Sequence, residues 1–148
     1  MNLLKDVEIV YGHAPVANAS NTDVTTTIVD TAGWDGVMCI QPITDSANTG
    51  KAELIARQNT ANSTSGMAAL SGATATKTDA GGDALNSKCL VVDVNRPQER
   101  YVDFNIKSSV ANVAFGDAII ILYNSQKKPT VQGTSVLHSV LVVSPAEA

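Results

Sequence analysis

Charged residues are scarce in this sequence, and arginine is scarcest of all. Asp, Glu, Lys and Arg make up 16% of the 148 residues, against roughly 25% in ordinary soluble domains. The net charge is −4, and the three arginines are scattered along the chain. Because phosphate backbones are bound by clustered Lys and Arg, we expect no nucleic-acid partner. A surface covered by Thr, Ser, Asn, Ala and Gly instead suits a protein that is partly buried against neighbours.

Cysteine, histidine and aromatic residues are also few. Cys39 and Cys89 lie far apart beside apolar runs, which predicts two buried, reduced thiols rather than a metal site. His13 and His138 have no further ligand at metal-binding spacing, so we expect no metal and no cofactor. Aromatic residues make up 4% of the chain, which is too few to favour the co-facial platform of a sugar-binding surface.

Membrane, secretion and catalytic signals are missing as well. The longest apolar run, Ala118–Tyr123, is far too short to cross a bilayer. Charges interrupt the first residues before an apolar region forms, so we expect synthesis in the cytoplasm and no membrane partner. The sequence holds no G-x-S-x-G elbow and no glycine-rich phosphate loop. We therefore expect that the protein is not an enzyme.

What the chain does contain is β patterning. About eight short runs of alternating or β-branched residues are separated by turn residues, and no segment reads as an amphipathic helix. The pattern predicts an all-β fold, an antiparallel β-sandwich of the jelly-roll kind with little or no helix. The predicted strands include residues 22–30, 37–43, 51–58, 67–76 and 135–143, the last of them in the core.

The stretch Leu90–Lys107 shows the clearest pattern. A β-branched run at 90–94 is followed by a turn that contains Pro97, and residues 100–107 then alternate. Val102, Phe104 and Ile106 are expected to face the core. Solvent is expected to cover the opposite face of that strand, which carries Tyr101, Asp103, Asn105 and Lys107. We interpret the two runs as an antiparallel pair.

We expect one domain. Residues 22–148 are assigned to a single β-sandwich, since no linker or repeat divides them. Residues 1–21 are either an extended N-terminal arm or the first strand of the sandwich, and the sequence leaves both alternatives open. The apolar residues of this segment precede the first clear sandwich strand, so an arm made of them could add to the sheet edge of a neighbour.

The sequence contains two distinctive turn motifs, Thr31-Ala32-Gly33-Trp34-Asp35-Gly36-Val37 and Arg96-Pro97 with Arg100-Tyr101-Val102. They resemble turns of the capsid decoration, or cement, proteins of tailed bacteriophages. The residues from Asp30 to Val37 follow the pattern D-x-x-G-aromatic-D that introduces a core strand in that family. Arg96-Pro97, with Arg100-Tyr101-Val102 after it, follows the pattern R-P-x-x-R-Y-V that joins two late strands. An amphipathic strand near Leu54 and the run Val91–Val94 occupy matching places.

The resemblance covers roughly residues 22–123. The chain departs from the family at Gly66-Met67, where many relatives carry an acidic, glycine-rich turn and a Trp, and it has a longer N-terminal segment. The resemblance implies a jelly-roll structural protein of the virion that binds the outside of an assembled capsid. It also implies the major capsid protein lattice and further copies of the chain, as a dimer or trimer, as partners.

We expect the contacts to the capsid or to other copies at apolar and aromatic residues of the N-terminal segment, the first motif turn and the late strand. These residues are Leu3, Leu4, Val7, Ile9, Tyr11, Trp34 and Tyr101. Two alternatives stay open. One is a phage tail or baseplate component, and the other is a β-sandwich module that binds a carbohydrate or another ligand, for which Trp34 and the tyrosines would supply the platform.

Overall fold

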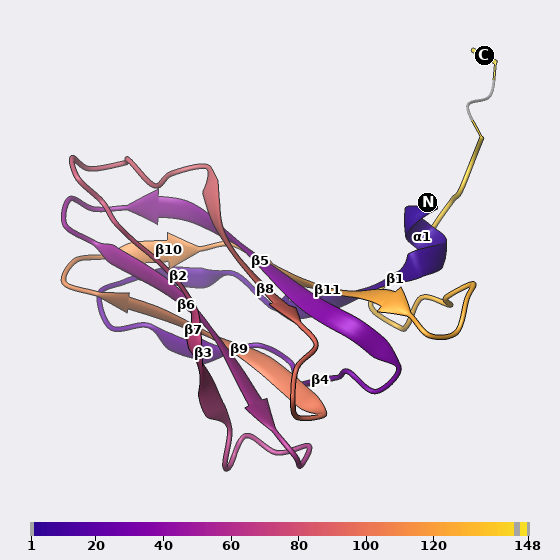
Figure 1. Ribbon diagram of the computed structural model, residues 1–148. Coiled ribbons are helices and arrows are strands. Elements are labelled where there is room, and N and C mark those ends of the chain that lie inside the picture. Colours follow the sequence, from indigo (N-terminus) through magenta and orange to yellow (C-terminus); the bar gives the residue numbers. More distant parts are fainter. Residues whose placement is uncertain (1, 144–145, 148) are drawn as a thin grey trace.

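The computed structural model describes residues 2–143 and 146–147 and shows two antiparallel β-sheets packed face to face (Figure 1). The elements in chain order are α1 (Leu3–Asp6), β1 (Val7–His13), β2 (Val16–Ala19), β3 (Asp23–Thr25), β4 (Val29–Asp30), β5 (Trp34–Ser46), β6 (Lys51–Asn59), β7 (Ala68–Thr78), β8 (Lys88–Asn95), β9 (Tyr101–Ser109), β10 (Val113–Phe115) and β11 (Ala118–Ser125). The all-β sandwich expected from the alternation is therefore confirmed.

The first sheet, here called sheet A, is built around the long strand β5. Two strands share one edge of β5: β11 pairs with its first part and β10 with its last part. Strand β1 lies outside β11, and β2 lies outside β10. On the other edge of β5 lies β8, which pairs with residues 36–43. Strand β1 pairs with β11 from Val7 opposite Tyr123 onward. Residues 7–13 are thus a strand of the sandwich.

The second sheet, sheet B, has β9 and β6 at its centre. Strand β7 pairs with the outer edge of β6, and the short strands β3 and β4 pair in turn with β9. The side chains of both sheets alternate between the shared core and the outside, as the pleat of a β-strand requires. The core is made from the inner faces of the two sheets. Its largest fully buried apolar residues are Phe104, Phe115, Leu54, Ile106, Ile120, Val37, Val102 and Val113.

The predicted pairing within 90–107 is wrong. Strand β8 pairs with β5 in sheet A, whereas β9 pairs with β6 in sheet B, so the turn between them crosses from one sheet to the other. The expected dry face of β9 is correct, because Val102, Phe104 and Ile106 are fully buried. Alternation fixes which face of a strand is dry, but it does not say which strand lies beside it.

The outer face of β9 also differs from the expectation. Asp103 and Asn105 are buried there instead of solvated. Arg57 of β6 binds both carboxylate oxygens of Asp103, with Nε at 2.8 Å and Nη2 at 2.6 Å. Asn105 donates to Asp23 of β3 at 2.7 Å. Polar side chains of the two neighbouring strands therefore cover these positions, and the alternation of β9 alone does not reveal them.

Two predicted strands have different limits. Residues 22–30 are divided into β3 and β4, because the amide of Thr27 leaves sheet B and donates to Gly12 of sheet A at 2.9 Å. The strand predicted at 37–43 instead runs from Trp34 to Ser46 as β5. It continues past Pro42, which lies where the neighbouring strand changes from β11 to β10, so the ladder is interrupted there in any case.

The predicted core strand 135–143 is wrong. The chain turns away from the sandwich at Gly133–Val136, and residues 137–143 carry no strand and are exposed. Figure 1 shows this segment extending away from the sheets beyond α1. The inner positions of both sheets are already occupied by other strands. Among the described residues, no helix is long and apolar enough to span a membrane.

Candidate docking surfaces

The two turn motifs meet at one end of the sandwich. Arg100 binds Asp30 through two hydrogen bonds, from Nε at 2.9 Å and Nη2 at 2.7 Å. This contact lowers the pKa of the Asp30 carboxyl. The amide and hydroxyl of Thr31 both donate to the carbonyl of Arg100, at 2.9 and 2.8 Å. Asp30 of β4 also lies opposite Tyr101 of β9 within sheet B. Although the two motifs are far apart in sequence, they therefore form one connected unit.

Strand β11 and helix α1 extend this unit. The amide of Arg96 donates to Asp35 at 2.6 Å, and the side chain of Asn124 donates to the Asp35 carboxylate. Lys128 contacts Asp6 at 2.6 Å, and this ion pair lowers the pKa of the Asp6 carboxyl. We call the region formed by residues 3–7, 30–35, 96–101 and 123–128 the end surface.

Two adjacent pockets open on the end surface. One of about 280 Å³ lies between α1 and β11 and is lined by Leu3, Val7 and Tyr123 together with three polar residues. The other, of about 340 Å³, has Trp34 in its wall and the chain from Ser125 to Lys127 opposite. Leu3 is 60% exposed beside the first pocket. An exposed apolar residue next to concave pockets is a typical arrangement for a protein-binding site.

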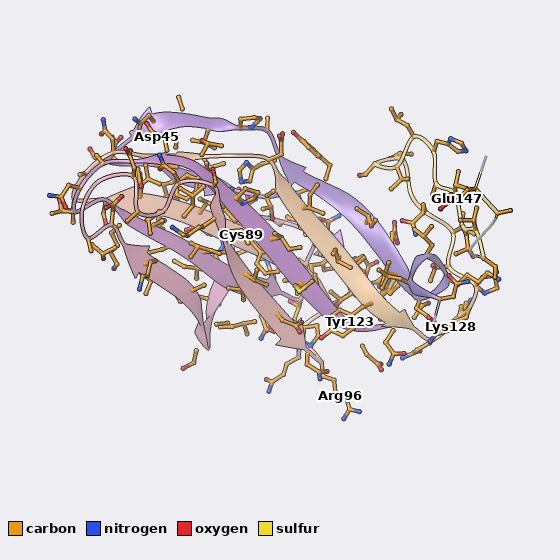
Figure 2. The ribbon with its side chains drawn as sticks, turned by 90° about the horizontal axis from the view of Figure 1, so that it is seen from above. Asp45, Cys89, Arg96, Tyr123, Lys128 and Glu147 are labelled. Carbon is orange, nitrogen blue, oxygen red and sulfur yellow. The ribbon has the colours of Figure 1, made fainter. Side chains whose placement is uncertain are left out.

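Tyr123 fixes the boundary between the end surface and the outside of sheet A. Its ring lies directly over Gly36 of β5, where a Cβ atom would come within 2.2 Å of the ring. Its hydroxyl donates to Asp93 of β8 at 2.8 Å, so the side chain crosses from β11 over β5 to β8. Burial, followed by the contact with Asp93, raises the pKa of Tyr123 to about 12. Figure 2 looks onto sheet A and labels this residue.

The outer face of sheet A is apolar over four neighbouring strands. Ile9, Ile121 and Met38 form one row across β1, β11 and β5. Ile119, Ile40 and Val91 form the next row across β11, β5 and β8. Val91 is 45% exposed and the other five are half-buried. We call these six residues the isoleucine face.

The outer face of sheet B has the opposite character. It carries the ion pairs Arg57–Asp103, Lys51–Glu53 and Lys107–Asp23. Ile55 is the apolar residue at its centre on β6, half-buried and opposite Asn105. A sheet face that is solvated normally carries polar side chains, which sheet B does and the isoleucine face does not. The two outer faces of the sandwich therefore differ in character, and the isoleucine face is the apolar one.

The residues expected to make contacts are divided between these surfaces. Leu3 and Leu4 lie on α1, and Val7 and Trp34 line the two pockets of the end surface, although Val7 itself is only 4% exposed. Ile9 belongs to the isoleucine face. Tyr11 adjoins that face opposite Ile119 and donates to Asp117, which raises the pKa of Tyr11. Tyr101 lies in sheet B beneath the guanidinium of Arg100, 5.3 Å from its ring centre.

The isoleucine face was not among the sites predicted from the sequence. The signal for it is the run Ala118–Tyr123, which is apolar at every position, whereas a strand with one solvated face should alternate. Ile120 and Leu122 point into the core. Ile119 and Ile121 therefore lie on the outer face of sheet A, which is apolar at these positions. A strand apolar on both sides predicts packing on both sides.

The two thiols lie in different environments. Cys39 is buried in the core as expected, and burial raises the pKa of its thiol to about 12. Cys89 is exposed on β8, so the expectation that it is buried is wrong. In the described part of the chain, no three His, Cys, Asp or Glu residues cluster in a way that could hold a metal ion.

No protein-family model and no curated protein matches this sequence.

Proposed function

We propose that this protein is a structural component of a phage virion that binds the outer surface of the assembled capsid and joins neighbouring capsid subunits. The observation that carries the proposal is the end surface. Both motif turns on which the resemblance to decoration proteins rests lie there in direct contact, through Arg100 and Asp30. The exposed Leu3 and the two pockets stand beside them.

A binding function of this kind has a simple physical basis. A protein that binds only the assembled lattice stabilises that lattice by mass action. Many weak contacts, each repeated at every equivalent position of the shell, add up through avidity. The end surface supplies an apolar anchor and a fixed scaffold for such a contact, and its ion pairs hold α1 and the two turns in place.

The test is cosedimentation with mature, expanded capsids of the phage that encodes the chain. We expect the wild-type protein to pellet with the capsids and to raise the temperature at which they lose their DNA. Leu3→Asp should weaken binding about tenfold or more, because burial of a Leu side chain contributes roughly 1.5–3 kcal/mol. A point substitution is preferable to an N-terminal truncation, which would remove residues of β1.

Val110→Asp is the matched control. Val110 is also an exposed apolar residue, at 75%, but it lies in the turn after β9, at the opposite end of the sandwich. Binding should be the same as for wild type. The proposal is wrong if the wild-type protein stays in the supernatant while the capsids are intact, or if both substitutions weaken binding equally.

A further inference from the structure

Two apolar parts of the described chain are left without a cover. One is the isoleucine face. The other is the segment 136–143, in which Leu137 is fully exposed and Val143 is 93% exposed. Within the described residues, no strand pairs with this segment. Apolar surface of this extent is usually covered by a partner.

The point at which the segment leaves the fold is fixed. The hydroxyl of Thr130 donates to the carbonyls of Leu4 and Val7, at 3.0 and 2.9 Å. The Gln132 side chain accepts from the amide of Ile9 at 3.0 Å and donates to the carbonyl of Val7 at 2.7 Å, as a neighbouring strand would. The turn at Gly133–Val136 then directs the chain away from its own sheets.

The two uncovered parts match in size and in charge. Eight extended residues span about 26 Å, which is enough to cross four strands at about 4.8 Å spacing. The sequence has no charged residue between Lys128 and Glu147, and the six residues of the isoleucine face are uncharged. Contact between these two sets of residues buries no charge of their own, which would be the main penalty on burial. The carboxylate of Asp93, which is exposed on the same face opposite Met38, already accepts a hydrogen bond from Tyr123.

We propose that residues 136–143 of one copy of this chain lie across the isoleucine face of a second copy, and that the exchange is reciprocal. Each copy of the resulting dimer then gives one segment and receives one. The β-branched residues of the segment favour an extended conformation, which suits packing on the ridges of Ile and Val side chains. This inference concerns the free protein and does not depend on capsid binding.

The first experiment measures the mass of the free protein by sedimentation equilibrium. We expect twice the chain mass of 15.4 kDa for wild type. The segment variant Val140→Asp/Val142→Asp and the face variant Val91→Asp/Ile119→Thr should each be monomeric. The control variant Val131→Asp/Ile55→Thr should stay dimeric, since Val131 precedes the segment and Ile55 lies on the other sheet.

Mixing the two monomeric variants gives the decisive result. The face variant still has a wild-type segment, and the segment variant still has a wild-type face, so the mixture should form heterodimers with one productive contact. If the dimer instead joins two faces or two segments, the mixture stays monomeric. A monomeric mixture overturns the proposal, as does a monomeric wild-type protein. Circular dichroism confirms that each variant is folded.

A second experiment leaves the face unchanged and uses the exposed thiol of Cys89, next to Val91 on β8. Cysteine is introduced in turn at Leu137, Ser139 and Leu141, and the protein is oxidised with diamide. We expect a disulfide between Cys89 and at least one of these positions, joining two chains on a non-reducing gel and identified by peptide mass spectrometry. Cysteine at Val131 should not form it. A disulfide confined to one chain, or none to Cys89, overturns the proposal.

Discussion

The contact between Gly36 and Tyr123 gives the sharpest prediction about stability. Gly36→Ala places a methyl group where the Tyr123 ring lies, 2.2 Å from its atoms, so the ring must move off β5. The move also breaks the hydrogen bond to Asp93. Overpacking of this kind costs about 1–3 kcal/mol, and the lost hydrogen bond costs about 1 kcal/mol.

A loss of about 2 kcal/mol in the free energy of unfolding is measurable by urea denaturation. With an m-value of about 2 kcal/mol/M for a small domain, the midpoint should fall by about 1 M. NMR titration of ring-labelled tyrosine gives an independent measurement. The pKa of Tyr123, now about 12, should move down toward its usual value of 10.0, because the displaced ring loses both its burial and the Asp93 contact.

Gly81→Ala is the matched control. Gly81 has no atom within 4 Å of the position of an added Cβ, so the same substitution should leave the midpoint unchanged within error. A Gly36→Ala variant that is as stable as Gly81→Ala, with an unaltered Tyr123 titration, would refute the predicted clash. That result would mean that sheet A accommodates the methyl group by a shift of the backbone.

Two further predictions concern local features. Val110 has a φ of 70°, a left-handed conformation that is unfavourable for a β-branched residue by roughly 1–2 kcal/mol. Val110→Gly should therefore raise the free energy of unfolding by about 1 kcal/mol. A urea midpoint that is unchanged or lower would contradict the backbone strain at Val110. The two thiols should differ in reactivity, because Cys89 is exposed while Cys39 is buried with a pKa of about 12. Native protein should react with a thiol reagent once per chain and urea-unfolded protein twice, and two rapid equivalents in the native state would contradict the burial of Cys39.

The sequence predicts the faces of strands well and their neighbours poorly. The strand predicted at 51–58 is observed as β6, and the inward residues of β9 are buried as expected. The pairing of β8 with β9 was wrong, because a turn of this length can join two strands of one sheet or cross between two sheets. Only the packing of the whole core decides between these, and alternation contains no information about it.

The surfaces were harder to predict than the fold. Contact between Asp30 and Arg100 joins residues that are 70 positions apart, and neither residue alone marks an end surface. The segment 135–143 has the composition of a core strand, yet its own copy provides no place for it. Local sequence reports that a segment prefers an apolar contact. It does not report which chain provides that contact.

The pairing of β1 with β11 has a consequence for how the chain is made. Val7 lies opposite Tyr123 and Tyr11 opposite Ile119, so β1 lacks its paired strand until β11, the last of the described strands in chain order, has been synthesised. Closing such a long loop is entropically costly and makes folding slow. During that interval the edge of β1 and the apolar residues on it are open to other nascent chains. The yield of folded protein should therefore depend on how fast translation is completed and on how crowded the polysome is.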